Sequence, residues 1–225
     1  MKAVRQIFSG KVYDMIKKPG GLVFSYLEDV IDDSILVKFK MLDAKTGVLT
    51  DIPKNVYLIA KFGSNYKPVL DLCDNFITTK AILLPSGKVF LCDKGGNCYL
   101  LDSDLSVLWN GVILYDDNPP SDIALYNNCV WASFSESNVL VRFNISTMRE
   151  ELRIGGSRSP FSQPKGLFIE GNTAIVSNAG SKSLTKVNLD TYSVEQYCEF
   201  GSPVRCYIKE DIYEFALLSD GIYSF

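Results

Sequence analysis

The segment Lys165-Gly-Leu-Phe-Ile-Glu-Gly-Asn-Thr-Ala-Ile-Val-Ser-Asn178 decides the fold class. Apolar and polar residues alternate on both sides of Glu170-Gly-Asn172, which is the pattern of two strands joined by a tight turn. Two earlier segments, Thr79–Asp93 and Ser121–Ser133, repeat this pattern almost position by position. A repeat built from short strands and tight turns predicts an all-β protein with a β-propeller architecture.

The spacing of the repeat fits a unit of four strands. The equivalent residues Leu105, Thr147 and Thr191 are 42 and 44 residues apart, and four-stranded propeller blades recur with about this period. The best-defined unit therefore has an inner strand, two middle strands and an outer strand. We predict these strands at residues 165–169, 173–177, 183–189 and 193–200.

The two ends of the chain together predict the last blade. Residues 204–225 supply only three strands, and a fourth is needed to cover the edge that they would leave exposed. Val4-Arg-Gln-Ile-Phe8 is free to supply it. We therefore expect residues 1–225 to form a single β-propeller domain, most simply of five four-stranded blades closed by the N-terminal strand.

One junction between units is longer than the others. A unit that begins at Val12 is followed by an insertion, which we place at about residues 52–76. Within it, Tyr57-Leu-Ile-Ala-Lys-Phe62 is apolar enough for us to expect that it lengthens an outer strand.

Composition limits the classes of partner. The chain has 225 residues, of which 47% are hydrophobic and 22% are charged, and its net charge is -3. This composition is globular. The scattered Lys and Arg residues offer no basic track for phosphates, so we expect no nucleic-acid partner. Neither a signal peptide nor a membrane span is recognisable, and we expect a cytoplasmic monomer without a membrane partner.

The six cysteines do not predict a zinc site. The sequence contains no Cys-x-x-Cys pair and no histidine, whereas zinc sites use such ligands at short spacing. Cys92 and Cys98 flank the turn Asp93-Lys-Gly-Gly-Asn97 and could face each other across a hairpin. The sequence leaves open whether they form a disulfide, although a reducing compartment argues for two thiols.

The middle strands and their turn resemble the NHL-type repeat, as in Val89–Leu101 and Ile175–Val187. The resemblance extends over about residues 79–200. That family places a polar residue before the turn and a small residue two positions later. The polar places are taken by Asp93, Ser133 and Asn178, and the small places by Gly95, Ser135 and Gly180.

The resemblance implies a propeller fold and several classes of function. Related propellers include protein-binding scaffolds, RNA binders, and enzymes of the gluconolactonase and streptogramin-lyase types. The streptogramin-lyase type relies on histidine, and a Ser-His-Asp triad needs it as well, so neither chemistry fits a chain without histidine. A gluconolactonase-like site, in which oxygen ligands hold a divalent cation, remains open.

Propeller geometry places a ligand site at the mouth of the channel, where the turns of several blades meet. The candidate ligand-binding residues on these turns are Asp93, Asn178, Asp220, Ser133 and Asp33. If a metal binds, Asp93, Asn178 and Asp220 are its candidate ligands, since hard cations prefer oxygen. The alternative is structural, because Asp, Asn and Ser side chains also bond to the backbone of the turns that they begin.

We therefore expect a non-catalytic propeller scaffold that recognises a protein partner or a small ligand at its face. The expectation assigns no catalytic residue and no cofactor. The alternative is a divalent-metal-dependent hydrolase of lactone or ester bonds, in which a metal-bound water would be the nucleophile.

Overall fold

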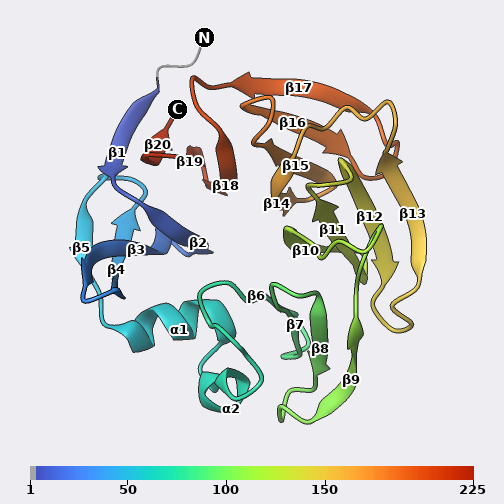
Figure 1. Ribbon diagram of the computed structural model, residues 1–225, viewed down its shortest axis with the longest axis horizontal. Helices are drawn as coiled ribbons and strands as arrows, with labels where there is room; N and C mark the ends of the chain where they lie inside the picture. Colours follow the sequence, from blue (N-terminus) through green and yellow to red (C-terminus); the bar gives the residue numbers. More distant parts are fainter. Residues whose placement is uncertain (1–3) are drawn as a thin grey trace. The chain divides into compact units, whose positions relative to one another are not determined.

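A computed structural model describes residues 4–225 of the chain and confirms the predicted fold class. Within this range there are twenty strands and two short helices (Figure 1). The strands form five four-stranded sheets, each of which is one blade of a five-bladed β-propeller. The chain divides into two compact units, and each is described by itself. Unit 2 comprises Thr79–Tyr207, and unit 1 comprises the chain up to Thr78 together with Ile208–Phe225.

Unit 2 contains blades 2, 3 and 4, each made of four consecutive antiparallel strands. Blade 2 consists of β6 (Lys80–Leu83), β7 (Val89–Cys92), β8 (Asn97–Leu101) and β9 (Val107–Val112). Blade 3 consists of β10 (Asp122–Tyr126), β11 (Cys129–Phe134), β12 (Val139–Asn144) and β13 (Glu150–Gly155). Blade 4 consists of β14 (Pro164–Glu170), β15 (Thr173–Asn178), β16 (Ser183–Asn188) and β17 (Val194–Glu199).

Tight turns set the register of these hairpins. Asn127 and Asn128 join β10 to β11, with φ angles of 48° and 57°. A two-residue hairpin turn of type I′ requires positive φ at both positions, and asparagine tolerates this conformation better than most residues do. The turn therefore fixes Tyr126 opposite Cys129, and the alternation of the following residues places one face of each strand in the core.

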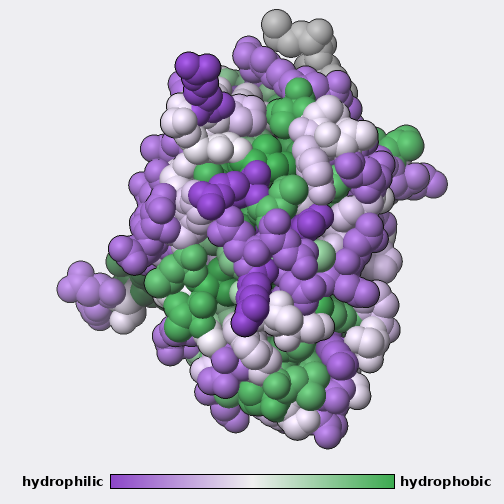
Figure 2. All heavy atoms as spheres, turned by 90° about the vertical axis from the view of Figure 1, so that its right-hand side faces the viewer, coloured by the Kyte–Doolittle hydropathy of each residue, from purple (hydrophilic) through white to green (hydrophobic). Residues whose placement is uncertain are grey.

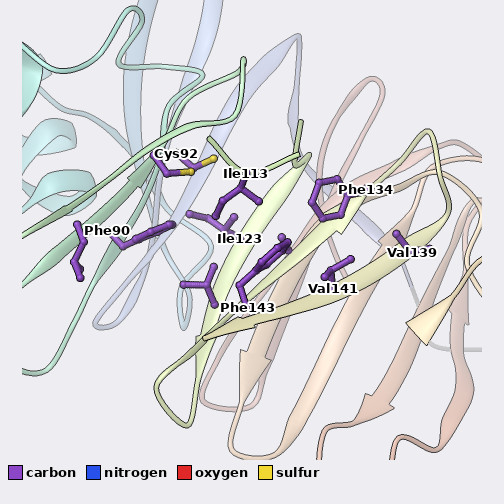
Figure 3. Close-up of a cluster of buried hydrophobic side chains, with 12 residues drawn as sticks. Phe90, Cys92, Ile113, Ile123, Phe134, Val139, Val141 and Phe143 are labelled. Carbon is purple, nitrogen blue, oxygen red and sulfur yellow. The ribbon is translucent and has the colours of Figure 1, made fainter. Parts of the chain in front are cut away.

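The core of unit 2 begins between blades 2 and 3. Phe90 of β7 lies in one cluster with Ile123 of β10, Phe134 of β11 and Phe143 of β12, all of them buried (Figure 3). Ile113, which directly follows β9, belongs to the same cluster. Complete burial of such a side chain contributes about 1.5–3 kcal/mol, so packing between blades is a main source of stability in this unit.

A second cluster lies between blades 3 and 4. Trp131 of β11 is completely buried there with Leu140, Leu167 and Val176. The sequence repeat places the tryptophan within a strand, and the structure shows that it packs between blades. Large aromatic side chains in this position remove much apolar surface from water.

Unit 1 contains blades 1 and 5. Blade 1 consists of β2 (Val12–Lys18), β3 (Gly21–Ile31), β4 (Ser34–Asp43) and β5 (Leu49–Asp51). Blade 5 consists of β18 (Val204–Glu210), whose first residues belong to unit 2, with β19 (Tyr213–Leu218), β20 (Gly221–Ser224) and β1 (Arg5–Ser9). The N-terminal β1 pairs with the C-terminal β20, from Arg5 opposite Ser224 to Ser9 opposite Gly221. The predicted closure of the last blade by the N-terminal strand is confirmed.

The predicted strand at residues 57–62 is wrong. This segment lies in α1 (Lys54–Phe62), which is followed by α2 (Tyr66–Leu70). The buried residues of α1 are Tyr57, Leu58, Lys61 and Phe62, which occupy one face of a helix because they are spaced by one, three and one positions. The apolar run has a helical period, and its short length made it resemble a strand.

A buried ion pair fixes α1 to blade 1. The Nζ atom of Lys61 lies 2.6 Å from Oδ2 of Asp14 in β2, and the Tyr57 hydroxyl donates to the same oxygen at 2.8 Å. Lys61 also donates to the carbonyl oxygen of Ile77. The pKa of Tyr57 is raised, mainly because the hydroxyl is buried and secondly because it lies beside the negative charge of Asp14. Helix α1 is thus joined to the blade by polar as well as apolar contacts.

Candidate functional site

Asp93 follows β7 and organises its own turn. One carboxylate oxygen accepts hydrogen bonds from the backbone N–H groups of Gly95 and Asn97, each at 2.8 Å. The other oxygen accepts from the side-chain amide of Asn97, also at 2.8 Å. Both oxygens are therefore engaged within the β7–β8 hairpin. This is the bonding that aspartate commonly provides in turns.

Asn178 is the last residue of β15 and is completely buried. Its side-chain oxygen accepts from the N–H of Ser162 at 3.2 Å, and its amide group donates to the hydroxyl of Thr185 at 2.9 Å. The amide group also lies 3.3 Å from the carbonyl oxygen of Val176. These bonds connect β15, β16 and the segment that precedes β14, so the side chain is held from three directions.

Ser133 lies within β11 and is completely buried. Its hydroxyl has no hydrogen-bond partner among residues 4–225, and the same holds for Ser177 of β15. The two serines are equivalent in their blades, because Ser133 lies opposite Asp122 and Ser177 lies opposite Gly166 on the first strand. The strands, rather than the turns, therefore carry this pair of hydroxyls.

Asp33 and Asp220 belong to unit 1. Asp33 is exposed at the tip of the β3–β4 hairpin with a φ of 63°. Asp220 lies between β19 and β20, where its carboxylate accepts a hydrogen bond from the Tyr223 hydroxyl at 2.8 Å. This hydrogen bond raises the pKa of Tyr223. The backbone oxygen of Asp220 accepts from the N–H of Gly10 at 3.0 Å, so its turn contacts the segment between β1 and β2.

Two further observations concern the classes of site that the sequence left open. Among residues 4–225 no group of three Asp, Glu, His or Cys side chains is arranged to hold a metal ion. Cys92 and Cys98 lie directly opposite each other on β7 and β8 as thiols. Their hydrogen-bonded contact, together with burial, raises the pKa of the Cys92 thiol.

A cluster of polar side chains lies at the first strands of the blades of unit 2, and the repeat pattern did not indicate it. Lys165 donates to the hydroxyl of Ser135 at 2.9 Å, and Ser121 donates to the same hydroxyl at 2.8 Å. Asp122 lies 3.4 Å from the Nζ atom of Lys80 and accepts from the N–H of Leu167 at 2.9 Å. These bonds connect residues of three neighbouring blades, which no single repeat unit can reveal.

A cavity of about 320 Å³ lies along blade 4. Six of its eight lining residues are polar, namely Ser181, Ser183, Thr185, Glu195, Gln196 and Glu199; the other two are Pro160 and Val194. Hydroxyl, amide and carboxylate groups in one concave space could bind a small polar ligand. The alternation of Ser181, Ser183 and Thr185 was the only sequence signal for it.

The outermost strand of blade 2 exposes apolar side chains. Val107, Leu108 and Val112 of β9 are exposed, and so is Leu114 just beyond it. Figure 2 views the side on which β9 and β13 lie, and hydrophobic residues reach the surface on the lower part of this face, at the height of β9 in Figure 1. The half-buried Trp109 of the same strand packs against the core cluster. Among the described residues of unit 2, no other strand exposes as many large apolar side chains as β9.

None of the helices between residues 4 and 225 has the length and apolar character needed to cross a membrane. No protein-family model matches the chain, and no curated protein matches it at a significant level.

Solved structures with a similar fold have low sequence identity to this chain. Hydrazine synthase of Kuenenia stuttgartiensis is 17% identical with a TM-score of 0.51, and the match covers 61% of this chain and 41% of that one. The computationally designed protein Ika4 is 13% identical with a TM-score of 0.49, covering 63% of this chain and 86% of that one. The designed protein Ika8 is 13% identical with a TM-score of 0.48, covering 95% and 57%. The likeness to hydrazine synthase concerns the fold alone.

Proposed function

We propose that this protein is a non-catalytic β-propeller scaffold that recognises a protein partner, and that strand β9 of blade 2 is its recognition surface. The proposal is carried by one observation. β9 is an edge strand that exposes Val107, Leu108 and Val112 and contains no charged residue. Exposed, uncharged edge strands are the places where another chain can add a strand.

The other blades provide the comparison within the same molecule. Every other outermost strand carries at least one charged residue, which discourages pairing with another chain. These residues are Arg5 of β1, Asp51 of β5, Glu150, Glu151 and Arg153 of β13, and Glu195 and Glu199 of β17. The apolar character of β9 is therefore specific to blade 2 and is not a general property of the repeat.

The geometry of β9 suits an extended ligand. A Cβ atom on Gly111 would lie 2.6 Å from the indole ring of Trp109, so the glycine leaves room for the tryptophan to lie along the strand. Side chains alternate between the two faces of a strand. Leu108, Asn110 and Val112 therefore share one face of β9, on which Leu108 and Val112 are exposed. Trp109 and Gly111 lie on the other face. A partner segment with alternating apolar residues would pair with the free edge and cover these side chains.

A small ligand is the second candidate, because the cavity along blade 4 has a volume of about 320 Å³ and is mostly polar. Pockets that bind small molecules begin at about this size. Ser183 and Thr185 are both buried, and Ser183 lies within 2.8 Å of the Ser181 hydroxyl. The two candidates are compatible, since they use different blades of unit 2.

The metal-dependent hydrolase is less well supported. Both carboxylate oxygens of Asp93 accept hydrogen bonds within its turn, and the side-chain oxygen of Asn178 accepts from Ser162. These bonds support the structural interpretation of the two residues. The NHL-like character of the blades, a cytoplasmic location and a monomeric state remain parts of the same proposal.

The test compares variants of the full chain in proximity labelling followed by quantitative mass spectrometry. Leu108→Lys combined with Val112→Lys places charges on the proposed edge, and Ile212→Lys is the matched control because Ile212 is an exposed aliphatic residue of unit 1. We expect the double variant to lose the proteins labelled by the wild type and the control to retain them. Equal labelling by all three proteins would refute recognition through β9.

A further inference from the structure

The hairpin of β3 and β4 extends beyond the rest of blade 1. β2 pairs with β3 only as far as Val12 opposite Tyr26, and β5 pairs with β4 only at residues 40–42. From residue 28 to residue 37 the two strands therefore have only each other as ladder partners. We call this segment the tip hairpin.

The tip hairpin has a defined conformation. Asp32 and Asp33 form its two-residue turn with φ angles of 44° and 63°, as the favoured hairpin turn requires. Beyond the turn Val30 lies opposite Ile35, and Asp29 lies opposite Leu36. A preformed hairpin loses less conformational entropy on binding than a flexible loop does.

Both faces of the tip hairpin expose apolar side chains. Val30 and Ile35 lie on one face and are 55% and 59% exposed. Ile31 and Leu36 lie on the other face and are 54% and 41% exposed. Single exposed aliphatic residues are normal in soluble proteins, but here each face of the hairpin carries a pair of them, and grouped exposed apolar residues are found at interaction sites.

The charged residues of the tip hairpin itself are all negative. Glu28, Asp29, Asp32 and Asp33 are exposed, and residues 27–37 contain no lysine or arginine. Glu28 accepts a hydrogen bond from Lys38 at 2.8 Å, which leaves three aspartates beside the apolar residues. A binding partner must therefore combine an apolar surface with positive charge.

We propose that the tip hairpin docks onto a partner protein whose surface is apolar and basic. Symmetric packing of two tip hairpins is disfavoured, because it would place like charges against each other. This surface is distinct from the β9 edge, since it belongs to unit 1 and β9 belongs to unit 2. The inference does not depend on the proposed role of β9.

The test uses the full chain and two synthetic peptides as probes, one alternating valine with lysine and the other alternating valine with glutamate. Binding is measured by fluorescence anisotropy. Variant V30S/I35S removes one apolar face, and D29N/D32N/D33N removes the charge while keeping residue types that tolerate the turn. D116N/D117N is the matched control, because Asp116 and Asp117 are also adjacent aspartates with positive φ, in unit 2.

We expect the lysine peptide to bind the wild type and D116N/D117N equally, and to bind each tip-hairpin variant about tenfold more weakly or worse. The glutamate peptide should not bind, and unchanged thermal unfolding of V30S/I35S would show that the loss is local. The proposal is overturned if the lysine peptide binds V30S/I35S as well as the wild type, or if D116N/D117N weakens binding equally. Light scattering that shows a dimer lost in V30S/I35S would instead assign the surface to a second copy, and binding to vesicles of anionic lipid lost in the same variant would assign it to a membrane.

Discussion

Blade 1 and blade 3 place an aspartate at the same position and neutralise it in different ways. Asp14 lies on the first strand of blade 1 opposite Ser25, and Asp122 lies on the first strand of blade 3 opposite Ser133. Asp14 pairs with Lys61 of α1, and Asp122 pairs with Lys80 of β6. The side chains of Lys61 and Asp14 are 4% and 8% exposed, whereas those of Lys80 and Asp122 are 33% and 13% exposed.

The difference shows what the insertion contributes. In blade 3 the cation comes from the first strand of the preceding blade, so two neighbouring blades supply the pair. In blade 1 the cation comes from a helix that no other blade contains, and the pair is shielded from solvent. A buried charge that loses its partner is far more costly than an exposed one, so α1 and blade 1 depend on each other.

Lys61→Met is expected to have the largest effect on the stability of the protein. The substitution replaces the lysine by an apolar side chain of similar length and removes the positive charge that faces the buried Asp14 carboxylate. We expect a loss of about 3–5 kcal/mol in the free energy of unfolding, measured by urea denaturation. The double variant Asp14→Leu with Lys61→Met should recover part of this loss, because it removes both buried charges. A Lys61→Met variant as stable as the wild type would mean that the pair does not hold α1 in place.

A smaller effect is expected for Asp122→Ala. This change removes the ion pair with Lys80 and leaves the Leu167 N–H without the Asp122 acceptor, for which we expect a loss of about 1–3 kcal/mol in the same measurement. Lys80→Met is the matched control and should cost less than about 1 kcal/mol, because the lysine is partly exposed. If Lys80→Met were as damaging as Lys61→Met, burial would not explain the difference between the two blades.

The smallest expected effect on stability concerns a partly buried carboxylate of unit 1, that of Glu210. The N–H of Gly20 donates to Glu210 at 2.8 Å, and this bond lowers the pKa of Glu210. The contribution of Glu210 to stability is therefore full above the pKa of the unfolded chain and is lost as the pH falls through the lower folded pKa. We expect Glu210→Gln to be less stable than the wild type at neutral pH and equal to it in strong acid. Urea midpoints measured across this range test the sign, and a difference that grows on acidification would contradict it.

The repeat made the blades predictable. Strand alternation and turn residues located β14 to β17 to within a few residues, because both signals are local in sequence. The closing strand β1 followed from counting the strands that residues 204–225 supply. The extension of β3 and β4 was not anticipated, because Asp29 resembles a turn residue and yet lies in β3. The strand continues past Asp29 because β3 remains paired with β4, and this pairing is not visible in the local sequence.

The inserted helix and the candidate site could not be predicted from the sequence. Whether Lys61 is exposed or buried depends on Asp14, which is 47 residues away, and no local pattern encodes that contact. Asp93 and Asn178 have residue types that suit both turns and ligand sites, so the sequence could not separate these roles. The hydrogen bonds of Asp93 and Asn178 in the structure support the structural role.

The two tryptophans of the chain occupy very different surroundings, which gives the protein two built-in optical reporters. Trp131 is completely buried between blades 3 and 4, and Trp109 is half-buried on the exposed strand β9. Their emission and quenching should therefore differ, with Trp131 protected from an added quencher such as iodide and Trp109 accessible to it. With Trp131 replaced by phenylalanine, the fluorescence of Trp109 alone would follow events at the edge of blade 2, with no label attached.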